Sequence, residues 1–132
     1  MSATPLFATP LWAALLTFLY LWLAARVIRA RYRTKTALGS GGDPGLERAI
    51  RAHANFAEYV PLALILIACI ELQGGWFWLV HLLGATLLAG RTLHAIGISR
   101  EHEILAWRRN GMILTFTTLA SAAVANLLLL AR

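Results

Sequence analysis

Four long apolar stretches constrain this chain more than any other feature of its sequence. They cover residues 6–28, 46–72, 76–98 and 112–131. A helix needs about 20 mostly apolar residues to cross the hydrocarbon core of a bilayer. The chain has 132 residues, of which 59% are hydrophobic and 14% are charged, so little is left for a water-soluble domain. The sequence therefore predicts an all-α fold over residues 1–132, a single integral membrane domain built as a four-helix bundle.

The first apolar stretch could be mistaken for a signal peptide, but two features argue against this. No basic segment precedes it, and its apolar run is too long. We therefore expect it to be a permanent helix. The single cysteine, Cys69, excludes an internal disulfide and a multi-cysteine metal site, and we expect no metal. Its place in the run ALILIACI is typical of a small core residue.

The basic residues indicate how the helices are oriented in the membrane. The net charge of +6 could suggest nucleic acid as a partner, but the basic residues do not cover a soluble face. They gather around the first and third connections, whereas the second connection, ELQGGWFW, has none. By the positive-inside rule the first and third connections are cytoplasmic, so both termini are predicted to be non-cytoplasmic and no nucleic acid is expected. The basic residues concerned are Arg26, Arg29, Arg31, Arg33, Lys35, Arg48, Arg51, Arg100, Arg108 and Arg109.

The connections differ in length. The first, residues 29–45, joins the basic run RARYRTK to the turn-rich segment LGSGGDPG and is predicted to be a mobile cytoplasmic loop. It could anchor the topology at anionic lipid headgroups or take a direct part in binding. Asp43 and Pro44 are predicted to start the second helix. Gly74 and Gly75 predict a tight turn, so the second and third helices should be antiparallel neighbours.

Polar residues interrupt the second and third apolar stretches with helical spacing. On the second helix, Arg51, Asn55 and Glu58 fall within about 60° of one another, and His53 points nearly opposite. A helix that rises about 1.5 Å per residue from the cytoplasmic end places this stripe in the cytoplasmic leaflet.

The third helix repeats the pattern, because Arg91 and His94 share one face at nearly the same depth. Arg108 lies at the cytoplasmic start of the fourth helix. Buried charges of this kind cost a few kcal/mol each and normally face a partner or a wet cavity. An ion pair of Glu58 with Arg51 or Arg91 could serve helix packing alone.

The excess of cations favours a second explanation, a pocket for an anion that opens to the cytoplasm. Three arginines, Arg51, Arg91 and Arg108, face Glu58 as the single carboxylate at this depth. Arginine binds carboxylates in a bidentate manner, glutamate can pair with an ammonium group, and asparagine can bind amides. The pattern therefore predicts a small, carboxylate-rich, zwitterionic ligand.

The segment ERAIRAHANFAEYVPL resembles the signature E-R-x-x-R-A-x-x-N-x-x-E-x-x-P of the MAPEG family, the membrane-associated proteins in eicosanoid and glutathione metabolism. GRTLHAIGI and RRNGM support the resemblance, which covers nearly the whole chain and is strongest to small bacterial members. It implies a homotrimer of four-helix subunits in the bacterial inner membrane. It also implies that glutathione binds between neighbouring subunits near the cytoplasmic side.

The resemblance assigns roles to individual residues. Arg108 matches the arginine that stabilises the glutathione thiolate and is the catalytic candidate, with Arg109 one residue away. Ile98 stands where prostaglandin E and leukotriene synthases carry a tyrosine, which puts efficient transferase chemistry in question. The residues that match glutathione contacts are Arg51, Asn55, Glu58, Arg91 and His94.

Three functions are open at this stage. The first is a membrane glutathione transferase or peroxidase, with glutathione as co-substrate and lipophilic electrophiles as substrates. The second is a non-catalytic protein on the same fold that binds lipid-like ligands or acts as a scaffold. The third is a small transporter with Glu58 as a proton-coupled site, which the many arginines disfavour. The expected partners are glutathione, lipophilic small molecules, membrane lipid and further copies of the chain.

Overall fold

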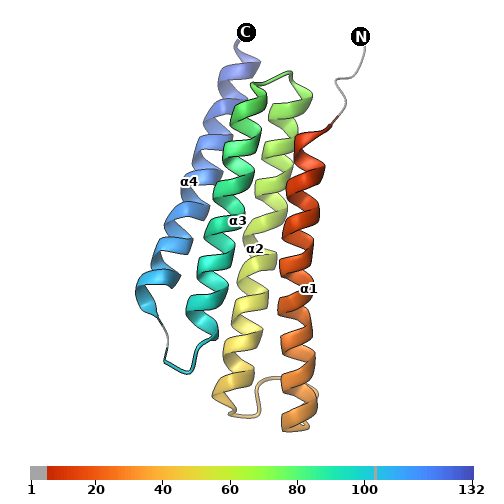
Figure 1. The fold of residues 1–132 in the computed structure, drawn as a ribbon, viewed down its shortest axis with the longest axis vertical. Coiled ribbons are helices and arrows are strands. Elements are labelled where there is room, and N and C mark those ends of the chain that lie inside the picture. Colours follow the sequence, from red (N-terminus) through yellow and green to blue (C-terminus); the bar gives the residue numbers. More distant parts are fainter. Residues whose placement is uncertain (1–5, 103) are drawn as a thin grey trace.

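A computed structural model describes residues 6–102 and 104–132, and these form four long helices (Figure 1). The helices are α1 (Ala8–Thr34), α2 (Pro44–Leu72), α3 (Phe77–Ser99) and α4 (Leu105–Leu130). All four are long and apolar enough to cross a membrane, judged by length and composition. The described part of the chain contains no strand. The predicted all-α fold with four membrane-spanning helices is confirmed.

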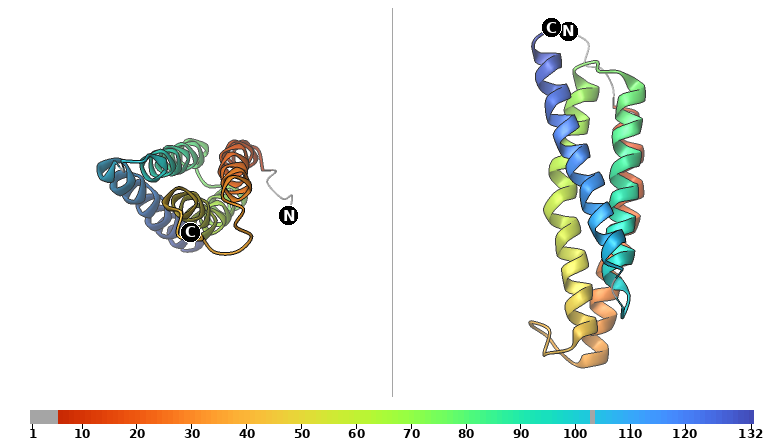
Figure 2. Two further views of the ribbon diagram at one scale, coloured as in Figure 1. Left: turned by 90° about the horizontal axis from the view of Figure 1, so that it is seen from below. Right: turned by 90° about the vertical axis from the view of Figure 1, so that its left-hand side faces the viewer.

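The helices α2 and α3 form the middle of the bundle. Each outer helix, α1 or α4, contacts both of them, and the described residues of α1 and α4 do not contact each other. The helices alternate in direction, so α1 begins and α4 ends at the same end of the bundle (Figures 1 and 2). The first and third connections lie together at the other end, which is the arrangement that the basic residues predict. The side of the membrane that each end faces stays a prediction.

Two helix boundaries differ from the predicted ones. Helix α1 continues to Thr34, so the basic run RARYRT is helical, and the prediction of a loop from residue 29 is wrong. Helix α4 begins at Leu105, seven residues before the predicted apolar stretch. The apolar stretches mark where a helix contacts lipid, whereas arginine and alanine favour helix wherever they lie. Both helices therefore extend beyond their apolar parts at the same end of the bundle.

The connections carry the turn residues that their geometry requires. Lys35 ends α1 in the left-handed conformation, with φ of 52°. The side chain of Asp43 accepts a hydrogen bond from the Leu46 amide at 2.6 Å, with Pro44 in the first turn of α2. This confirms the predicted start of the second helix. The predicted tight turn before α3 is also confirmed, since Gly74 has a φ of +70°.

Helices α3 and α4 approach each other closely through glycines. A Cβ atom on Gly111 would lie 2.5 Å from the carbonyl oxygen of Gly90 and 2.6 Å from the amide nitrogen of His94. A Cβ on Gly97 would lie 2.8 Å from the amide nitrogen of Arg108. Small residues at these positions let the two backbones touch. The polar part of α3 is thereby held directly against the first turns of α4.

A carboxylate stabilises the end of the bundle at which α1 begins. Glu71, near the end of α2, accepts hydrogen bonds from the backbone amides of Phe7, Ala8 and Thr9 at 2.7, 2.7 and 2.8 Å. The first amides of a helix have no partner within the helix, and they favour negative charge. Glu71 therefore caps α1 from a distant part of the chain.

Candidate functional site

Arg91 lies at the centre of the polar region. Its side chain is 1% exposed. It donates from Nη1 to Oδ1 of Asn55 at 2.7 Å, and its Nη2 lies 3.2 Å from Sδ of Met112 on α4. Its guanidinium also lies 5.8 Å from the ring centroid of Tyr59. Two helices thus surround this cation of α3: α2 supplies an amide oxygen and an aromatic ring, and α4 supplies a thioether.

The hydrogen bond between Arg91 and Asn55 joins the polar faces of α2 and α3 at one depth. The opposite face of α2 has a different partner, because the His53 ring lies 4.9 Å from the ring of Tyr20 on α1. The helical spacing correctly predicts this separation of His53 from the stripe. Asn55 therefore faces α3, and its side-chain oxygen already accepts a hydrogen bond from the guanidinium of Arg91.

Arg51 and Glu58 lie on the outer surface of α2. Both side chains are exposed. Glu58 is 14 residues from Pro44 and 14 residues from Leu72, which places it at the midpoint of the helix. Glu58 pairs with neither Arg51 nor Arg91, because the one ion pair within residues 6–102 and 104–132 joins Arg33 to Asp43. The structure therefore does not show the ion pair of Glu58 that would serve helix packing alone.

His94 and Arg108 lie where α3 meets the start of α4. His94 is 3% exposed, and its backbone packs against α4, where a Cβ atom on Gly111 would lie 2.6 Å from the His94 amide nitrogen. Arg108 is half-buried in the first turn of α4, whereas Arg109 is exposed. A helix N-terminus and a guanidinium both favour an anion nearby. This corner of the bundle can thus stabilise negative charge, and of its two neighbouring arginines Arg108 is the one that packs inward.

The structure gathers part of the predicted site and leaves part of it outside. One group, on the facing sides of α2, α3 and α4, consists of Asn55, Arg91, His94 and Arg108. The other group, Arg51 and Glu58, faces away from the subunit. Ile98 is buried, and its side chain carries no hydroxyl group. Among the residues described, no cluster of His, Cys, Asp or Glu could hold a metal ion.

Sequence reasoning missed two neighbours of Arg91. Tyr59 directly follows Glu58, and Met112 lies in the RRNGM segment, so both were within quoted motifs. Tyrosine and methionine are common in apolar cores, so their residue types alone did not indicate contact with a cation.

Comparison with known proteins gives consistent results. The model of the MAPEG family matches residues 9–128. Two relatives from Escherichia coli, in strain K12 and in O6:H1 strain CFT073, are each named inner membrane protein YecN. Each is 39% identical to this chain over 117 residues, which cover 89% of this chain and 88% of the relative. Together with its four apolar helices, these matches make the chain an integral protein of the bacterial inner membrane.

Proposed function

Because the chain belongs to the MAPEG family, we propose that it binds glutathione near the cytoplasmic side of the membrane and transfers it to lipophilic electrophiles, or reduces lipophilic peroxides with it. One observation carries the proposal. Arg51 and Glu58 present opposite charges on the outer face of α2, and neither forms an ion pair with a described residue. A zwitterionic ligand with carboxylate and ammonium groups can satisfy both.

The exposed charges also support a homotrimer. A charged side chain that faces lipid inside the bilayer costs a few kcal/mol. In a single subunit, the charge of Glu58, at the midpoint of α2, would face lipid. A neighbouring subunit placed against this face would shield Arg51 and Glu58 from lipid. The resulting interface would form the glutathione site.

Each polar group has a distinct role in this proposal. Arg51 binds a glutathione carboxylate in a bidentate manner, and Glu58 pairs with the ammonium group. The side-chain oxygen of Asn55 accepts a hydrogen bond from Arg91. Its NH₂ group is therefore available to donate to an amide carbonyl of the ligand. Arg91 is then a positioning residue that fixes the orientation of the Asn55 amide.

The chemical step requires the glutathione thiolate. An unperturbed thiol has a pKa of about 8.5, so only a few per cent is ionised at neutral pH. The guanidinium of Arg108 and the N-terminus of α4 favour the thiolate. The sulfur then attacks the electrophilic carbon, a bond from sulfur to carbon forms, and the leaving group departs with its electron pair. An apolar substrate can reach this position from the bilayer.

A second candidate function is a lipid-ligand binder without catalysis. The buried Ile98 favours it, since the hydroxyl group that the synthases carry at this position is missing. Both functions predict a site for glutathione or for a similar anion, and they differ only in turnover.

The test uses the full-length protein purified in mild detergent. Calorimetry should show glutathione binding that is weakened in Arg51→Ala and in Glu58→Gln. Absorbance should show glutathione-dependent conversion of an aryl halide. Binding without turnover would favour the second candidate, and no binding of glutathione at all would refute the proposal.

A further inference from the structure

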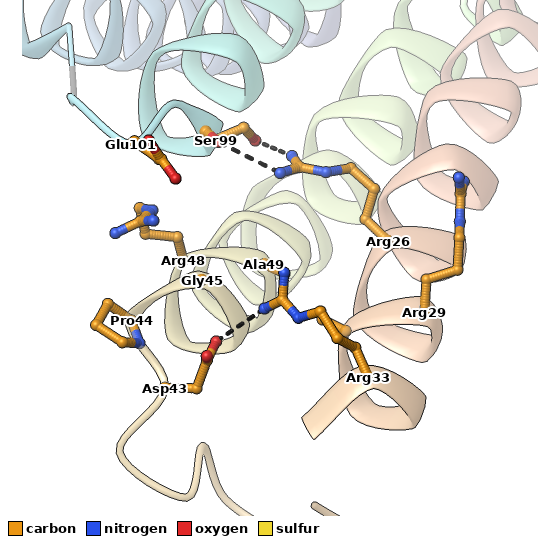
Figure 3. Close-up of a pocket in the computed structure, with 11 residues that line it drawn as sticks. Arg26, Arg29, Arg33, Asp43, Pro44, Gly45, Arg48, Ala49, Ser99 and Glu101 are labelled. Atoms are coloured by element: carbon orange, nitrogen blue, oxygen red, sulfur yellow. Dashed lines mark hydrogen bonds and ion pairs between the residues drawn. The ribbon is translucent and has the colours of Figure 1, made fainter. Parts of the chain in front are cut away.

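The end of the bundle that carries the first and third connections contains a polar cavity of about 610 Å³. It lies between the last turns of α1, the first turns of α2 and the connection that follows α3 (Figure 3). None of the residues that match glutathione contacts lines it. Its charged lining consists of Arg26, Arg29, Arg33, Arg48, Asp43 and Glu101.

This lining has more positive than negative charge. Four arginines and two carboxylates leave a formal charge of +2. Asp43 is already engaged, because it pairs with Arg33 at 3.0 Å and caps the Leu46 amide. Within the described part of the chain, Arg48 pairs with no carboxylate, including that of Glu101. The cavity therefore holds cations that lack anionic partners.

Arg26 places a positive charge well inside this end of the bundle. It lies eight residues before Thr34, or about 12 Å along the helix axis. It donates to the hydroxyl and to the carbonyl oxygen of Ser99, the last residue of α3 (Figure 3). These acceptors are neutral, as is the ring of Trp22, whose centroid lies 5.0 Å from the guanidinium, and no carboxylate of the described residues pairs with Arg26. An anion in the cavity would compensate its charge.

The start of α2 forms one wall of the cavity. Gly45 lines the cavity, and a Cβ atom there would lie 3.0 Å from Nη2 of Arg33 and 3.1 Å from Oδ1 of Asp43. The glycine therefore makes room for the ion pair that forms this wall. Asp43 already accepts hydrogen bonds from the amides of Leu46 and Glu47, so the cavity offers an anion its arginines rather than the N-terminus of α2.

We propose that this cavity binds a phosphate group, carried either by an anionic phospholipid of the adjacent leaflet or by a soluble phosphorylated molecule. Guanidinium groups match the oxygens of phosphate in bidentate geometry. The cavity lies at the ends of membrane-spanning helices, the depth at which lipid phosphates lie, and basic pockets between such helices bind anionic headgroups. The charge of +2 balances one phosphate monoester or two phosphodiesters.

The test measures lipid retention by native mass spectrometry on the full-length protein in nonionic detergent. Phosphatidylglycerol is compared with phosphatidylcholine of the same acyl chains, and inorganic phosphate is added in a separate series. The test variant is Arg26→Gln with Arg48→Gln. The control is Lys35→Gln with Arg100→Gln, which removes the same charge at the same end of the bundle, outside the cavity.

We expect the wild type and the control to retain phosphatidylglycerol about tenfold better than phosphatidylcholine, and the test variant to lose this preference. Arg26 contacts Ser99, so its replacement could disturb the fold. The single variant Arg48→Gln avoids this, because Arg48 makes no hydrogen bond or ion pair with the described residues, and it should weaken the preference alone.

The series separates the two sources of phosphate. A preference that inorganic phosphate does not reduce assigns the site to lipid. Tight binding of inorganic phosphate, lost in the test variant, assigns it to a soluble molecule. The proposal is overturned if the wild type shows neither effect, or if the test variant and the control behave alike. Glutathione binding by the test variant, measured in parallel, should be unchanged.

Discussion

Two glutamates on α2, Glu58 and Glu71, have opposite surroundings. Glu71 accepts three hydrogen bonds from the backbone at the start of α1, so its charge is satisfied within the subunit. Glu58, thirteen residues earlier on the same helix, is exposed and forms no ion pair within residues 6–102 and 104–132. One carboxylate completes the fold. The other has no ion-pair partner among the described residues of the subunit, and we propose that it binds a ligand.

The arginines of the polar region divide in the same way. Arg91 is buried and held by Asn55, whereas Arg51 is exposed on the outer face of α2. A buried charge that has partners acts on stability, and removing a partner is costly. An exposed charge inside the bilayer adds little to the stability of the isolated subunit. It adds more to the binding of a ligand or subunit that covers it. The comparison therefore separates residues of the fold from residues of the proposed site.

The largest expected effect is on stability, at Glu71. Replacement Glu71→Ala leaves three amides at the start of α1 without an acceptor. It should lower the free energy of unfolding by about 5 kcal/mol, near the lower end of three bonds worth about 1.5–3 kcal/mol each, because one of the three is exposed. Glu58→Ala should change the stability of the subunit little. Denaturant unfolding in detergent micelles measures both, and equal losses in the two variants would contradict the comparison.

The next effect is on binding, at Arg51. If Arg51 holds a glutathione carboxylate, Arg51→Ala should raise the dissociation constant about 100-fold, or about 3 kcal/mol. Arg100→Ala, which removes an exposed arginine outside the site, is the control and should bind normally. Titration calorimetry with glutathione measures both constants. Unchanged affinity in Arg51→Ala would show that the exposed charges serve subunit contacts alone.

The third effect separates two roles of one side chain, Asn55. In Asn55→Ala the buried Arg91 loses its acceptor, which should cost about 2 kcal/mol of stability. Asn55→Asp keeps an acceptor oxygen for Arg91 but no longer carries an NH₂ donor. We therefore expect this variant to be folded and to bind glutathione more weakly. Normal glutathione binding by a stable Asn55→Asp variant would leave Asn55 with a structural role only.

Much of this arrangement could be predicted from the sequence, because bilayer thickness and helical periodicity act on local stretches of chain. Apolar length locates four helices, and a spacing of three or four residues separates Arg51, Asn55 and Glu58 from His53 on α2. The spacing does not show that Asn55 faces α3 while Arg51 and Glu58 face outward. Glycine and an aspartate-proline pair mark the turns for equally local reasons.

Other features depend on contacts between distant segments and leave no local pattern. Periodicity shows which face of α3 carries Arg91 but not that Asn55, rather than Glu58, is its partner. The contact of Arg26 with Ser99 joins residues 73 positions apart, and the cavity beside it exists only where three helix ends meet. The end of α1 and the start of α4 were also missed, because both helices continue into the basic residues next to their apolar stretches.

The smallest effect concerns the thiol chemistry at the start of α4. If Arg108 stabilises the thiolate, Arg108→Ala should raise the pKa of bound glutathione by about one unit, which corresponds to about 1.4 kcal/mol. The direction follows from charge: the guanidinium favours the anion, so its loss moves thiolate formation and turnover to higher pH. Binding of an S-alkylated glutathione, which carries no charge on sulfur, should be nearly unchanged. The ultraviolet absorbance of the thiolate, titrated against pH, measures the shift directly. Arg109→Ala should titrate like the wild type because Arg109 is exposed while Arg108 packs inward, and a shift in Arg109→Ala alone would transfer the role to that residue.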